Sequence, residues 1–135
     1  MLFDDMEFGS YDRAERNARK AYELYEDGRM AQALVELDLA LEINPTNSAW
    51  HFNKGLTLDA ISRFREAISE YEAALELNPD DLEILNSLAV DYTRTGQYDR
   101  AIKTFEYVQQ LEDTLLRGAP VPEWAQRRRA ANLTR

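Results

Sequence analysis

The sequence repeats itself with a period of 34 residues, and this repeat constrains the fold more than any other feature. Segment 40–45 reads ALEINP and segment 74–79 reads ALELNP, so only one of the paired residues differs. Residues of one size class also stay in register through three copies. The matching sets are Ala21/Gly55/Ala89, Leu24/Leu58/Tyr92, Met30/Phe64/Tyr98, Ala33/Ala67/Ala101, Leu37/Tyr71/Phe105 and Ala40/Ala74/Val108. A period of about 20–50 residues is typical of proteins that stack similar structural units.

Each copy is expected to form two α-helices joined by a tight turn. Apolar residues recur at steps of three and four, as in Ala67, Tyr71 and Ala74, and the alternation typical of strands is absent. Asn47 and Asp81 precede helical stretches and are suitable N-caps. The expected helices span residues 11–27, 47–60, 64–77, 81–94 and 98–112. The sequence therefore predicts an all-α fold.

The pattern resembles the tetratricopeptide repeat (TPR) over residues 14–115. It divides into units 14–47, 48–81 and 82–115, and it is clearest in the second unit. The residues that carry it there are Gly55, Leu58, Ala67, Tyr71, Ala74 and Pro79. Asp113 stands where the closing proline of the third unit is expected, so helix 98–112 has room to run on. The resemblance implies an α–α solenoid, a right-handed superhelix whose first helices line a concave, peptide-binding groove.

The two ends of the chain differ from the repeats. Residues 1–13 read as an acidic and apolar tail with the start of the first helix, which Ser10 is able to cap. Three arrangements of this tail stay open: loose, lying over the repeat end or groove, or docked into a neighbouring copy. Residues 116–135 read as a linker and a basic helix in which Trp124 caps the last repeat. An arginine-rich docking motif is the alternative for that segment.

Composition excludes several classes of function. The net charge is −9, and residues 1–113 hold 24 acids and 11 bases whereas residues 114–135 hold one acid and five arginines. An acidic body repels phosphate backbones, so we expect no nucleic-acid partner. No stretch is long and apolar enough to span a membrane, and the N-terminus lacks the basic region of a signal peptide. We expect a soluble protein in the cytoplasm.

Nothing in the sequence indicates catalysis. The chain has no cysteine, and its single histidine, His51, has no partner constellation and is expected to pack structurally. Motifs for nucleotide, zinc or calcium binding are absent. We therefore expect a protein that is not an enzyme and that has no catalytic residues, no cofactor and no metal.

The candidate binding site is the groove that the resemblance implies. On the expected groove face, exposed aromatic residues beside polar groups are typical binding anchors. The candidate residues are Arg19, Tyr22, Tyr25, Phe52, Asn53, Leu56, Asp59, Asn86, Val90 and Arg94. The alternative is that these side chains pack between helices or lie under the N-terminal segment.

The groove chemistry indicates which partner to expect. Of the polar clamp by which some family members bind a C-terminal Glu-Glu-Val-Asp carboxylate, only Asn53 is retained. The acids Glu15, Glu26, Asp59 and Glu83 favour a neutral or basic partner with apolar anchors. We therefore expect a protein–protein interaction module, an adaptor or scaffold that binds a peptide or helical segment. The alternative is a homo-oligomeric structural scaffold held by contacts between the acidic body and the basic C-terminal segment.

Overall fold

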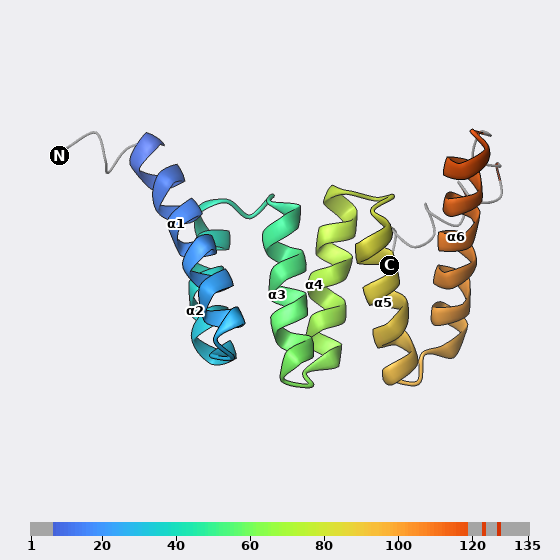
Figure 1. Ribbon diagram of the computed structural model, residues 1–135, viewed down its shortest axis with the longest axis horizontal. Helices are drawn as coiled ribbons and strands as arrows, with labels where there is room; N and C mark the ends of the chain where they lie inside the picture. Colours follow the sequence, from blue (N-terminus) through green and yellow to red (C-terminus); the bar gives the residue numbers. More distant parts are fainter. Residues whose placement is uncertain (1–6, 119–122, 124–126, 128–135) are drawn as a thin grey trace.

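The computed structural model describes residues 7–118, together with residues 123 and 127, and residues 7–118 form six α-helices (Figure 1). Consecutive helices pack against each other in antiparallel pairs, and the pairs follow one another along the long axis of the molecule. The helices are α1 (Glu7–Glu26), α2 (Met30–Ile43), α3 (Ser48–Ala60), α4 (Phe64–Leu77), α5 (Leu82–Arg94) and α6 (Tyr98–Arg117). The predicted all-α solenoid of helix pairs is confirmed.

Local residue choices explain where the helices begin. The side chain of Asn47 accepts a hydrogen bond from the backbone N–H of Trp50 at 3.0 Å, and Asp81 accepts one from Ile84 at 3.1 Å. Each bond satisfies a first-turn N–H that has no partner within the helix. Both N-caps that the sequence predicts are therefore confirmed.

The turn inside each repeat needs a left-handed residue. Gly28 and Gly96 take φ values of 78° and 77° at this point, and the second repeat uses Ser62 at φ 62° instead. Glycine adopts this conformation without penalty, whereas a residue with a Cβ is strained in it. The turn thus has the same geometry in all three repeats, although one copy lacks the glycine.

The hydrophobic core is divided into two clusters. One joins α1 and α2 and receives Trp50 from α3, while the other fills the space among α3, α4, α5 and α6. Leu34 of α2 packs on the second cluster. The first and second repeats are therefore joined by a few apolar contacts, and their boundary contains a polar cluster.

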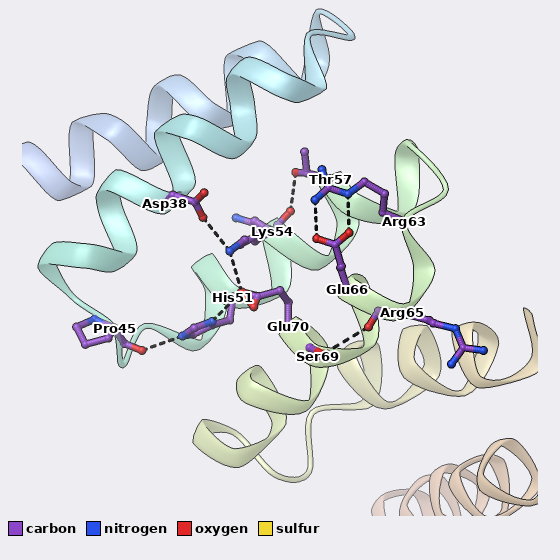
Figure 2. Close-up of polar contacts among 11 residues, drawn as sticks. Asp38, Pro45, His51, Lys54, Thr57, Arg63, Arg65, Glu66, Ser69 and Glu70 are labelled. Atoms are coloured by element: carbon purple, nitrogen blue, oxygen red, sulfur yellow. Dashed lines mark hydrogen bonds and ion pairs between the residues drawn. The ribbon is translucent and has the colours of Figure 1, made fainter. Parts of the chain in front are cut away.

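This polar cluster is centred on Lys54 (Figure 2). Lys54 Nζ lies 2.8 Å from Asp38 Oδ1 of α2 and 3.5 Å from Glu70 Oε1 of α4. Burial lowers the pKa of Lys54, but the bonds and charges of Asp38 and Glu70 outweigh it and leave the pKa raised. At the same place one repeat later stands the buried Leu88. A charged residue thus replaces an apolar one at the boundary between the first and second repeats.

Some expectations about the ends of helices are wrong. The first helix begins at Glu7 rather than residue 11, so Ser10 lies inside α1 and does not cap it. The last helix runs on to Arg117, as the missing proline allows, and Gly118 ends it in a left-handed conformation. The N-terminal tail and the basic helix around Trp124 lie largely outside the described residues.

In the described part of the chain, no helix has the apolar length that crossing a membrane requires.

Candidate functional site

A pocket opens between α1 and α3, over the floor that α2 provides. We call it the α1–α3 pocket. Its lining is largely apolar and consists of Ala18, Ala21, Tyr22, Tyr25, Leu37, Asn53, Leu56 and Thr57. It encloses about 60 Å³, well below the ~300–1,000 Å³ of small-molecule sites. The pocket has room for part of one side chain and not for a cofactor.

Small residues of α1 make this pocket possible. Ala18 and Ala21 stand where longer side chains would fill the space against α3. Tyr22 forms an open edge of the pocket, with 62% of its surface exposed, and Tyr25 is half-buried beside it. A mouth with an exposed tyrosine over an apolar floor is suited to hold an apolar side chain of a partner.

The structure brings four of the ten candidate residues together in this pocket, namely Tyr22, Tyr25, Asn53 and Leu56. Arg19 and Asn86 are exposed and do not line the α1–α3 pocket, and Val90 is exposed on α5. Asp59 and Arg94 lie together at the carboxyl ends of α3 and α5, where their side chains approach to 3.9 Å. Six of the ten candidate residues therefore fall into two separate groups rather than one continuous strip, and Arg19, Asn86 and Val90 belong to neither group.

Phe52 is the exception, because it belongs to the core. Only 9% of its surface is exposed, and its ring packs on that of Tyr71 with centroids 5.6 Å apart. The expectation of an exposed anchor is wrong here, because Phe52 faces α4 rather than the open side of α3. The sequence analysis also missed Thr57, a buried residue that lines the α1–α3 pocket. Its hydroxyl donates a hydrogen bond to the backbone carbonyl of Asn53, one turn earlier in α3, at 2.7 Å.

The second group contains a buried carboxyl pair that the sequence did not predict. Asp91 of α5 is fully buried, and the guanidinium of Arg94 lies beside both carboxyls, 3.1 Å from Asp91 Oδ1 and 3.9 Å from Asp59 Oδ1. Tyr71 donates to Asp59 Oδ2 at 2.5 Å, and Arg94 donates to Asp91 Oδ1 at 3.1 Å. Burial, assisted by the Asp59 carboxyl, raises the pKa of Asp91 to about 7, although Arg94 opposes the shift. Asp91 stands one repeat after Thr57, at a position that is buried in the second repeat, and one helical turn before Arg94. An acid at a buried position of the repeat, one turn from an arginine, is the sequence signal for such a pair.

His51 has the packing role that the sequence predicts. Its Nε2 lies 2.8 Å from the carbonyl oxygen of Pro45, and its Nδ1 lies 3.4 Å from Glu70 (Figure 2). These contacts tie the turn before α3 to α4. Across the part of the chain that the structure describes, no three potential ligand side chains gather to hold a metal ion.

Comparison with known proteins identifies the repeat. The model of the tetratricopeptide repeat family matches residues 52–113, which contain helices α4 and α5 and most of α3 and α6. Residues 52–113 of this chain are therefore similar to the tetratricopeptide repeat family. Tetratricopeptide repeats form protein–protein interaction modules and are generally not catalytic. No curated protein matches the chain.

Several solved structures share the fold at low sequence identity. A MamA structure superposes with a TM-score of 0.74 at 21% identity, covering 77% of this chain and 61% of its own. The TPR domain of Arabidopsis OM64 gives 0.71 at 14% identity, covering 93% and 98%. A chain of the CopN–Scc3 complex gives 0.68 at 19% identity, covering 90% and 67%. The match covers 61% of the MamA chain, so the chain described here spans less than two thirds of that protein's length.

Proposed function

We propose that this protein binds a peptide or helical segment of another protein on the face formed by α1, α3 and α5, with one apolar side chain anchored in the α1–α3 pocket. The observation that carries the proposal is the pocket itself. It is apolar, it is sized for part of a single side chain, and an exposed tyrosine borders it. Binding would remove an apolar side chain of the partner and the Tyr22 ring from water, and this burial of apolar surface supplies binding free energy.

The charges near the pocket indicate the chemistry of the partner. Glu15 is half-buried on α1, and Glu26 and Glu83 are exposed. Asp59 no longer counts as a free acid, because it bonds to Tyr71 and faces Asp91. The remaining acids favour a neutral or basic segment, and a C-terminal carboxylate of the Glu-Glu-Val-Asp type is a poor ligand for this surface.

The experiment compares two tyrosines of equal exposure. Tyr22 borders the pocket and Tyr98 lies on α6, and each has 62% of its surface exposed. A partner captured from source lysate is purified, and its affinity is measured for the wild type, Tyr22→Ala and Tyr98→Ala. We expect at least a tenfold loss for Tyr22→Ala, which is about 1.4 kcal/mol, and none for Tyr98→Ala. Equal affinity for both variants contradicts the proposed site.

A second candidate function, self-assembly, is favoured by the surface of α6. In α4, Ile68 and Tyr71 are buried, yet their counterparts one repeat later, Ile102 and Phe105, are 55% and 43% exposed. A further unit stacked on α6 would cover them. That unit can come from a second copy whose acidic body meets the basic segment 116–135. Light scattering at low salt and high protein concentration tests this: we expect assembly that weakens with salt, and a monomer throughout removes the candidate.

A further inference from the structure

Helices α3 and α5 each carry a carboxyl group with one buried oxygen that lacks a hydrogen-bond donor in the described part of the chain. Asp59 Oδ1 and Asp91 Oδ2 are buried, and none of the described residues donates a hydrogen bond to either atom. The other oxygen of each group is satisfied, by Tyr71 for Asp59 and by Arg94 for Asp91. Two ionised carboxylates that share one arginine in a buried site repel each other strongly. A buried acceptor pair of this kind requires a donor between its members.

We propose that a single proton shared between Asp59 and Asp91 joins α3 to α5 and holds these two helices of the second and third repeats in their observed geometry. The protonated carboxyl donates its O–H to the ionised one, so one proton satisfies both orphan oxygens. The pair then carries one negative charge, which the guanidinium of Arg94 balances. Arg94 lies 3.1 Å from Asp91 and is itself held over the Phe64 ring at 5.1 Å.

Among the described residues, no neighbouring side chain donates a hydrogen bond to the two unsatisfied oxygens, so the donor is the O–H of a protonated carboxyl. From α4, Tyr71 directs its hydroxyl to the outer oxygen of Asp59, and burial raises the pKa of Tyr71, which keeps it a donor. From α1, the charge of Tyr25 adds to the raised pKa of Tyr71. From α5, Arg94 Nη1 is 3.9 Å from Asp59 Oδ1, too far for a hydrogen bond. From α6, Arg100 lies over the ring of Tyr92.

Loss of this proton near neutral pH would open the link. The raised pKa of Asp91 means that the folded protein keeps a proton which the unfolded chain releases near its ordinary value of 3.8. The native state thus binds more protons, and the contribution of the pair to stability falls as the pH rises from about 4 to about 7. Above that range the pair carries two charges against one arginine. Repulsion then acts directly between α3 and α5.

The first test reads the proton directly. Carbon-13 NMR of the side-chain carboxyl groups follows Asp59 and Asp91 from pH 4 to pH 9. We expect one joint titration near neutrality at both carboxyl carbons. The carboxyl of Asp113, which is exposed on α6, is recorded as a reference signal. Two ordinary titrations below pH 5 overturn the proposal. This readout reports the carboxyl carbons alone and carries no signal from the imidazole of His51.

The second test uses a variant that replaces the proton with a permanent donor. In Asp91→Asn the amide N–H₂ donates to Asp59 at every pH. Urea unfolding is measured from pH 5 to pH 8.5 for the wild type, for this variant and for Asp113→Asn as a control for net charge. We expect Asp91→Asn to match the wild type at pH 5 and to unfold at higher urea at pH 8. A pH dependence identical to that of the wild type contradicts the shared proton.

The third test examines geometry and the alternative occupant. Because the chain has no cysteine, single spin labels can be introduced at the exposed positions 60 and 93. The distance between them is expected to increase from pH 5.5 to pH 8.5 in the wild-type background and to stay constant in Asp91→Asn. All measurements are repeated with calcium and with a chelator. A dependence on either one shows that a cation, and not a proton, occupies the site.

Discussion

Gly55 of α3 lies against the ring of Tyr71 of α4 so closely that a Cβ on residue 55 would stand 2.4 Å from Cε1 of that ring. The ring has no free space, because it is fully buried, packs on Phe52 and donates its hydroxyl to Asp59. The close approach of α3 and α4 in the second repeat therefore depends on the absence of a side chain at residue 55.

This contact predicts that Gly55→Ala destabilises the protein even though alanine favours a helix. Overpacking costs about 1–3 kcal/mol, whereas the gain in helix propensity is about 1 kcal/mol. Urea unfolding should therefore show a net loss of up to about 2 kcal/mol. The double variant Gly55→Ala/Tyr71→Leu is the control, because a smaller residue 71 gives the methyl group room and should reduce the penalty of the alanine. An unchanged penalty in that background contradicts the explanation.

Phe52 and Tyr22 should respond to truncation in opposite ways. Phe52→Ala removes a core aromatic ring and is expected to lose about 3–5 kcal/mol of unfolding free energy. Tyr22→Ala removes an exposed side chain and is expected to stay within about 0.5 kcal/mol of the wild type. Circular dichroism during urea unfolding measures both. If Phe52→Ala unfolds like the wild type, Phe52 is not a core residue.

The left-handed turn at Ser62 offers a stabilising substitution. Ser62→Gly should raise the free energy of unfolding by about 0.5–1 kcal/mol, because glycine accepts a φ of 62° without the strain that a Cβ imposes. Ser69→Gly is the matched control. Ser69 is exposed inside α4, where glycine weakens a helix, so this variant should lower stability. Chemical unfolding that shifts both variants in the same direction refutes the strain argument.

Filling the α1–α3 pocket should block binding without unfolding the protein. Ala18→Phe places a ring in the space that the proposed anchor side chain would occupy, so we expect at least a tenfold loss of partner affinity. Ala31→Phe is the control, because Ala31 is exposed on α2 and does not line this pocket. Thermal unfolding of both variants checks that the fold persists. Retained affinity in Ala18→Phe removes the pocket from the binding surface.

Local signals account for the success of the sequence in predicting the fold. The N-caps Asn47 and Asp81 and the glycines at 28 and 96 act on their own neighbours, so their effects can be read from sequence alone. The common period of 34 residues then places the helix pairs. Ser62 shows that tertiary structure can impose a left-handed turn where the local signal is missing.

The candidate site was less predictable, because burial depends on which helix lies opposite. Phe52 and Leu56 are both apolar and one turn apart on α3, yet Phe52 is buried within the core, whereas Leu56 packs on the edge of that core and also lines the α1–α3 pocket. Their separation follows from the direction in which α4 approaches α3. The Asp59–Asp91 pair joins residues 32 positions apart, so the repeat period of 34 does not bring them into register.

The polar boundary around Lys54 has a consequence for how the chain unfolds. In a linear array, cooperativity depends on the coupling between neighbouring units, and apolar interfaces couple units more strongly than partly exposed ion pairs do. The second and third repeats share one core, whereas the first repeat has its own. Hydrogen exchange in α1 and α2 should therefore occur through a local opening that leaves α3 to α6 protected. The helices that carry Tyr22 and the small residues of the pocket can thus detach while the rest of the molecule stays folded.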